Sequence, residues 1–161
     1  KIINQNMIDF SINNKFDVIV SICDSINYII DEKDLLATFM NVKKHMNKDG
    51  LFIFDINSYY KLSHIIGNNI FVEDREDVFY IWENFYDEKS NIVEFYITFF
   101  TKDEEGKYTR FDEEHFEKAY KVEKIVELLK RADFNEIHIF DGISFNKPNK
   151  KSERLTFVAM G

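Results

Sequence analysis

The first polar cluster that could take part in chemistry is DSINY, which supplies Asp24, Ser25, Asn27 and Tyr28 directly after the apolar stretch FDVIVSIC. Burying an unpaired carboxylate costs roughly several kcal/mol. Asp24 therefore needs a partner, a ligand or access to solvent.

A second cluster follows the apolar stretch LFIFDI and contributes Asn57, Ser58 and Tyr59 beside Asp55. Asp, Asn and Ser also favour turns and helix caps, which explains either cluster when it is taken alone. Ligands of open parallel sheets bind beyond the carboxyl ends of the strands. Two such clusters after consecutive strands therefore favour a shared pocket.

Further side chains for this pocket come from the middle of the chain. His115 and Glu114 in EEHF are the proton acceptors that we consider beside Asp24, and in a strand they point to opposite faces. A histidine on a strand is more often structural than catalytic. Most aromatic residues here should be core, but Tyr80, Trp82 and Tyr96 could form a lid over a planar substrate.

The elements that must position these residues begin with a β-α-β unit. Residues 16–23 and 51–56 are nearly continuous apolar runs, as expected for parallel strands that are covered on both faces. Asp31 can cap a helix between them, and the turn NKDG should close that helix. The apolar stripe of this helix is Leu35, Phe39, Val42 and Met46.

Strand patterns at residues 78–86, 91–101 and 107–116 predict an antiparallel meander. A helix with Val122, Ile125 and Leu129 on one face follows, and two closing strands should pair antiparallel because the loop between them is too short for a crossover. We therefore expect an α/β fold: a mostly parallel Rossmann-like sheet from residues 1–69 and 119–161, with an antiparallel last strand and an inserted meander at residues 70–118.

Composition narrows the class of protein. The 161 residues are 45% hydrophobic, enough for one core, and the formal charge of -8 argues against nucleic acid or an anionic membrane as partner. The single cysteine, Cys23, excludes an internal disulfide, and we expect it to pack inside the first strand. No membrane-spanning run or signal peptide pattern is found, so a cytoplasmic protein is expected. We assign no metal ligands.

The order of these motifs resembles a known family. FDVIV, DSINY, LFIFDINS, DEEHFEKAY, RADF and SERLTFVA are together similar to the later part of a class I S-adenosylmethionine-dependent methyltransferase of the small bacterial type. The similarity covers essentially the whole chain and starts at the third strand of that fold. Its terminal antiparallel strand pair is the topological hallmark of the fold.

The resemblance also implies roles for individual residues. Asn6 and Met7 would contact the adenine of S-adenosyl-L-methionine, with Asn6 in place of the usual Asp, while Asp24 and Ser25 would lie beside the methionine part. Asp133 replaces the glycine that usually forms a left-handed cap. The residues expected to bind substrate are Asn27, Tyr28, Asn57, Tyr59 and Trp82. The glycine-rich turn of the family is not among the 161 residues, so we expect the sequence to be part of a longer chain.

The activity that the resemblance implies is transfer of a sulfonium methyl group to a small molecule. The protein would align the acceptor and remove its proton where needed. The alternative is a noncatalytic Rossmann-like binding module whose meander mediates dimerisation. A homodimer is compatible with both.

Overall fold

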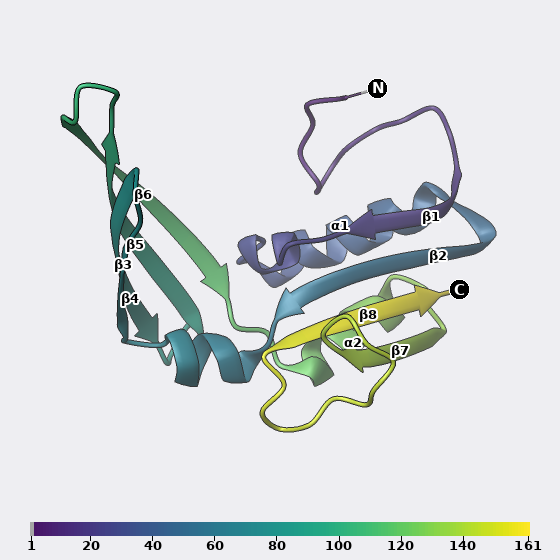
Figure 1. Cartoon of the computed structure of the whole chain (residues 1–161). Helices are drawn as coiled ribbons and strands as arrows, with labels where there is room; N and C mark the ends of the chain where they lie inside the picture. Colours follow the sequence, from purple (N-terminus) through teal and green to yellow (C-terminus); the bar gives the residue numbers. More distant parts are fainter. Residues whose placement is uncertain (1) are drawn as a thin grey trace.

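The computed structural model describes residues 2–161, which contain two four-stranded sheets (Figure 1). Sheet A has the strand order β1-β2-β8-β7, formed by β1 (Phe16–Ser21), β2 (Met46–Asn57), β8 (Arg154–Met160) and β7 (Glu136–Asp141). Sheet B has the order β3-β4-β5-β6, formed by β3 (Ile70–Asp74), β4 (Val78–Asp87), β5 (Ile92–Lys102) and β6 (Tyr108–Lys118). Sheet B projects from one end of sheet A (Figure 1).

The β-α-β unit is present as predicted. β1 and β2 pair in parallel, and α1 (Glu32–Lys44) connects them after a short 3-10 helix, η1 (Ser25–Tyr28). The Asp31 carboxylate accepts hydrogen bonds from the backbone N–H groups of Lys33 and Asp34, so it caps α1.

The end of α1 differs from the prediction. The helix stops at Lys44, and Met46 is the first residue of β2, where it is still buried. The NKDG residues lie within β2 instead of forming a separate turn. The pairing shifts from Phe16–Met46 to Val18–Leu51, so the extra residues of β2 bulge out of the ladder.

The closing strands also pair as predicted. β8 runs antiparallel to both β2 and β7, so β1, β2 and β7 share one direction and β8 opposes them. The helix α2 (Val122–Arg131) precedes β7. It ends before Asp133, which has a φ of 68° and therefore adopts the left-handed conformation expected for it.

The main core lies between sheet A and the two helices α1 and α2. It contains Phe39, Phe52, Phe54, Phe134 and Phe157, all fully buried or nearly so. On the opposite face of β1, Val18 and Val20 are exposed, and Ile22 directly after the strand is exposed as well. The expectation that both faces of this strand are covered is therefore wrong for the part of the chain that the structure describes.

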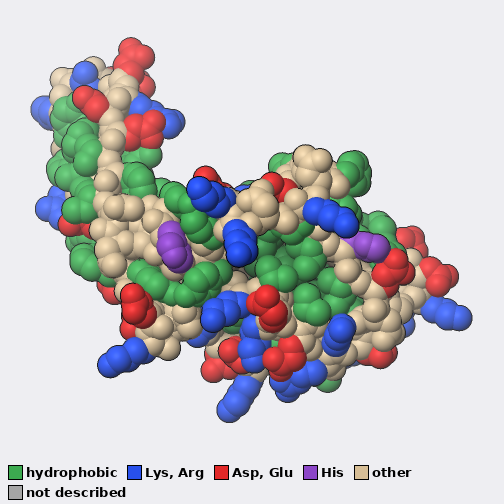
Figure 2. Space-filling model, turned by 90° about the horizontal axis from the view of Figure 1, so that it is seen from below, with side chains coloured by type: hydrophobic (Ala, Val, Ile, Leu, Met, Phe, Trp, Pro, Cys, Tyr) green, Lys and Arg blue, Asp and Glu red, His purple; other side chains and the backbone are tan. Residues whose placement is uncertain are grey.

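Sheet B contains the three predicted strands plus β3, which the sequence analysis missed. Register places Trp82, Phe95 and His115 on one face of the sheet, which we call the inner face. The inner face packs against the short π-helix η2 (Lys61–Ile66) through Leu62 and Ile66. Hydrophobic side chains gather along sheet B in the space-filling view (Figure 2).

No helix between residues 2 and 161 is both long enough and apolar enough to cross a membrane.

Candidate functional site

The backbone turns sharply where β1 ends. Cys23 and Asp24 have consecutive left-handed φ values of 58° and 51°. Such conformations are costly for residues other than glycine and concentrate at functional sites. The Ser25 hydroxyl stabilises the turn by donating to the Ile22 carbonyl at 2.7 Å. Cys23 is exposed, so the prediction that it packs inside the strand is wrong.

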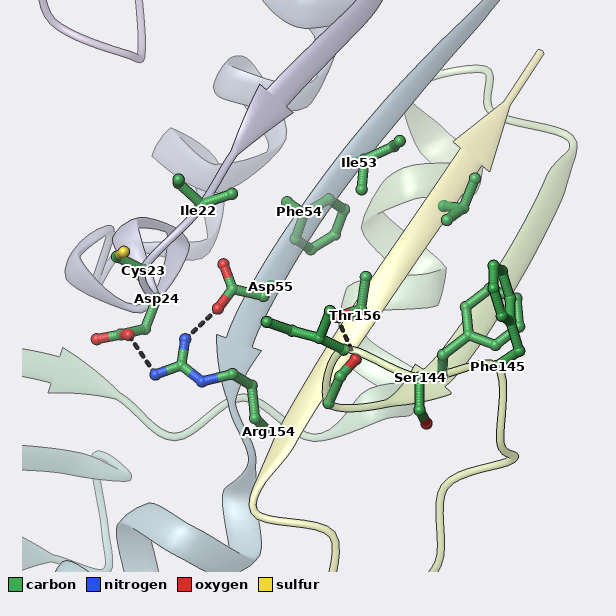
Figure 3. A pocket seen from close by; sticks show the side chains of 14 residues that line it. Ile22, Cys23, Asp24, Ile53, Phe54, Asp55, Ser144, Phe145, Arg154 and Thr156 are labelled. Atoms are coloured by element: carbon green, nitrogen blue, oxygen red, sulfur yellow. Dashed lines mark hydrogen bonds and ion pairs between the residues drawn. The ribbon is translucent and has the colours of Figure 1, made fainter.

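Asp24 has a partner that lies far away in the sequence. The Arg154 guanidinium donates to the Asp24 carboxylate at 2.7 Å and also binds Asp55 at the end of β2 (Figure 3). The two predicted polar clusters therefore do meet at one edge of sheet A, and Arg154 joins them. Asp24 is therefore a paired carboxylate, so the free-energy cost of burying an unpaired charge does not apply to it.

These three side chains border a cavity of about 690 Å³ on the face of sheet A opposite the helices (Figure 3). The other walls are largely apolar and include Ile53, Phe140 and Val158. One oxygen of Asp55, Oδ1, is buried without a hydrogen-bond partner in residues 2–161. A cavity with apolar walls and a few polar groups at one end is typical of small-molecule sites.

Asn27 lies beneath this edge and is completely buried. Its side-chain amide donates to the carbonyls of Asn57 and Lys118 at 3.1 and 3.0 Å, and its oxygen accepts from the Asn57 N–H at 3.0 Å. Asn27 thus ties η1 to the end of β2 and the end of β6. The expectation that Asn27 binds substrate is not supported, because all three of these groups are protein groups and the side chain has no exposed surface.

Asn57 continues the same network and is also buried. Its amide donates to Glu117 Oε2 at 3.0 Å, and its oxygen accepts from Lys61 Nζ at 2.9 Å and from Arg154 at 3.4 Å. We call Asn27, Asn57, Lys61 and Glu117 the junction network, because they connect sheet A, η2 and sheet B. Asn57 therefore connects Arg154 at the edge of sheet A with Lys61 and Glu117.

Glu117 is the buried acid of this network. Burial raises the pKa of Glu117 to about 7, the hydrogen bond from Asn57 opposes this shift, and the Asp24 carboxylate adds to it. Glu117 can therefore hold a proton near neutral pH.

His115 lies beside Tyr28 across the gap between η1 and sheet B. Tyr28 Oη is 3.5 Å from His115 Nδ1, and the two rings meet edge to face at 5.9 Å. On its other side, His115 Nε2 is 3.2 Å from Glu113 Oε2. Glu114 pairs in register with Tyr96 and lies on the opposite, outer face, so the predicted separation of the two proton acceptors is found.

The aromatic residues expected at the site are divided between the two faces. Trp82 and Tyr80 lie on the inner face with His115, whereas Tyr96 lies on the outer face, so these three cannot form one lid. Trp82 packs edge to face on Phe95, and its buried Nε1 has no hydrogen-bond partner within residues 2–161. Tyr59 packs beside this cluster and accepts a hydrogen bond from the Tyr86 hydroxyl at 3.2 Å.

Met7 packs against the main core beside β1, and Asn6 precedes it in the chain. Asn6 Oδ1 accepts from the Ile8 N–H at 3.0 Å, which forms a local turn. Met7 lines a small apolar hollow of about 130 Å³ together with Phe10, Ile19 and Val42. Asn6 does not line this hollow, and the expected contacts of Asn6 and Met7 with the adenine of the cofactor stay a prediction.

Arg154, Glu117 and Lys61 were not predicted as site residues. Arg154 is the first residue of β8 and pairs in register with Asn57. The available signal was its place at the start of a strand beside the acid-rich end of β2. Nothing local in the sequence distinguishes Glu117 from its acidic neighbours.

Proteins from two bacteria are similar in sequence to this chain. A protein of Geobacillus sp. (strain WCH70), provisionally named a methyltransferase, is 34% identical over 155 residues, which are 96% of this chain and 63% of that protein. A similarly named Bacillus subtilis (strain 168) protein, YqeM, is 32% identical over 91% of this chain and 59% of its own length. No family model matches the chain.

The solved structures include a crystal structure of an S-adenosylmethionine-dependent methyltransferase from Clostridium acetobutylicum ATCC 824. It superimposes with a TM-score of 0.92 at 47% sequence identity, over 97% of this chain and 62% of that chain. The resemblance to class I S-adenosylmethionine-dependent methyltransferases is confirmed. The α/β methyltransferase fold is likewise supported, and the chain spans about three fifths of the length of these relatives.

Proposed function

We propose that the protein carrying this chain is an S-adenosyl-L-methionine-dependent methyltransferase that acts on a small molecule. The observation that carries the proposal is the meeting of Asp24, Asp55 and Arg154 at the carboxyl ends of β1 and β2, in a fold shared with a 47% identical methyltransferase. The apolar cavity of about 690 Å³ beside them supports a small-molecule ligand.

The cofactor would contact this chain in two segments, one before β1 and one directly after it. Asn6 and Met7 would hold the adenine end, and Asp24 and Ser25 in the left-handed turn would lie beside the methionine end. When bound, S-adenosyl-L-methionine supplies an activated methyl group. The residues of this chain then have to orient the acceptor, exclude water and accept a proton.

His115 is the proposed proton acceptor of the reaction. It lies on the inner face of β6, beside Tyr28. Tyr28 is the last residue of η1, which directly follows the left-handed turn at Cys23 and Asp24. Glu114 points away from this position and has no role in the proposal. The proposed substrate contacts are Tyr28, Tyr59 and Trp82, which lie outside the cavity of about 690 Å³. Asn57 of the junction network supports them.

Binding of S-adenosylhomocysteine by the full-length protein tests this function. A ligand at a hundred times its dissociation constant stabilises the folded state by roughly 2.7 kcal/mol, so a clear rise in melting temperature is expected. The absence of binding in isothermal titration calorimetry would contradict the proposal.

Asp24→Asn localises the binding site in the same experiment. Asn tolerates the left-handed backbone, so we expect about tenfold weaker binding of S-adenosylhomocysteine with a small change in melting temperature. The matched control is Asp133→Asn, because Asp133 is also left-handed but lies at the end of α2. Equal affinities of the two variants would show that Asp24 serves only the fold.

A further inference from the structure

The contacts of His115 determine which of its nitrogens carries hydrogen. Glu113 Oε2 is 3.2 Å from Nε2, and a carboxylate can only accept a hydrogen bond. The neutral imidazole therefore carries its hydrogen on Nε2 and has a lone pair on Nδ1. That lone pair faces the Tyr28 hydroxyl at 3.5 Å, a long contact of the kind that tightens when a substrate is bound.

Both nitrogens of His115 are thus directed at protein groups. Tyr28 is 45% exposed, and its contact with His115 leaves a lone pair on the hydroxyl oxygen free to accept a proton from a bound molecule. The edge-to-face contact of the two rings holds the phenol in this orientation.

The surroundings of Tyr28 favour the protonated form of its hydroxyl. Burial raises the pKa of Tyr28, and Glu117, Asp24 and Glu113 add to that effect. Glu113 and Glu117 lie on β6, which packs against η1, and Asp24 lies in the turn before η1. Tyr28 therefore stays protonated and can accept a proton only while it gives up its own.

We propose that Tyr28, His115 and Glu113 form a proton relay in which Tyr28 is the catalytic residue that contacts the methyl acceptor. This inference rests on the proposed methyltransferase function. The acceptor nucleophile forms a bond to the methyl carbon as the bond from carbon to sulfur breaks, and the sulfur keeps that electron pair. The acceptor proton passes to Tyr28 Oη, the Tyr28 proton passes to His115 Nδ1, and Glu113 stabilises the resulting imidazolium.

The test is nitrogen NMR of the His115 imidazole in the full-length protein, with S-adenosylhomocysteine as the added probe. We expect the Nε2–H tautomer, and we expect the Nδ1 resonance to move downfield in Tyr28→Phe because its hydrogen-bond donor is lost. Glu113→Gln should weaken the preference for this tautomer. The matched controls are Tyr108→Phe and Glu76→Gln. They alter exposed side chains at the opposite end of β6 and in the loop between β3 and β4, and should leave both signals unchanged.

An Nδ1–H tautomer in the wild-type protein, or an unchanged Nδ1 signal in Tyr28→Phe, would overturn the relay. Failure of the underlying function is distinguishable, because the wild-type protein would then not bind S-adenosylhomocysteine. If the probe binds and the tautomer is Nδ1–H, the relay alone is rejected.

Discussion

Glu117 is a single residue whose protonation should affect the stability of the fold. Its folded pKa of about 7 lies above the ordinary value of 4.5. For a carboxyl group with a raised pKa, the stabilising contribution is fully present below the unfolded pKa and is lost as the pH rises through the folded pKa. As the pH rises from 5 to 8, ionisation of Glu117 should therefore lower the free energy of unfolding by an amount on the order of 3 kcal/mol.

Glu117→Gln should remove this dependence, because the amide oxygen can still accept from Asn57 but cannot ionise. We expect urea unfolding to show a variant that is more stable than the wild-type protein at pH 8 and similar to it at pH 5. The control Glu114→Gln changes an exposed acid on the opposite face of the same strand and should follow the wild-type profile. Parallel profiles of Glu117→Gln and wild type would show that Glu117 does not titrate in this range.

At the scale of elements, Asn27 holds η1 against the ends of β2 and β6. Asn27→Ala removes three hydrogen bonds and leaves buried backbone groups unpaired, so a loss of roughly 2–4 kcal/mol is expected in chemical denaturation. Asn135→Ala is the matched control, since Asn135 is exposed and its expected effect is within about 0.5 kcal/mol. A loss below about 1 kcal/mol for Asn27→Ala would mean that water replaces these bonds.

At the scale of the whole molecule, the outer face of sheet B is apolar and exposed at Ile70, Val72, Phe85 and Phe116. Exposed apolar patches on soluble proteins commonly mark interaction sites. We therefore expect the full-length protein to be a homodimer through this face, which would leave the inner face available for the site.

Light scattering after size exclusion should show a dimer for the wild-type protein and a monomer for the double variant Val72→Lys, Phe85→Lys. Binding of S-adenosylhomocysteine should be retained in that variant, because its two positions lie on the face opposite His115. Met40→Lys places the same charge at an exposed site on α1 and should remain dimeric. A monomeric wild-type protein would rule out this interface.

The sequence by itself determined the elements and the general place of the site. The apolar runs before DSINY and DINSYY, the Asp31 cap and the strand patterns of the meander are local signals, and the structure confirms the elements that they predicted. The separation of His115 from Glu114 also followed from the two-residue period of a strand, which is a local property of the backbone.

Only the tertiary structure decided which side chains meet. Arg154 reaches Asp24 across 130 positions of the sequence, and Asn57 binds Glu117 across 60. Strand order and register create both contacts, and they also bury Asn27, which the sequence had suggested as a substrate ligand. Residue types and spacing identify groups that can do chemistry, but partners and burial depend on packing between segments that are distant in the chain.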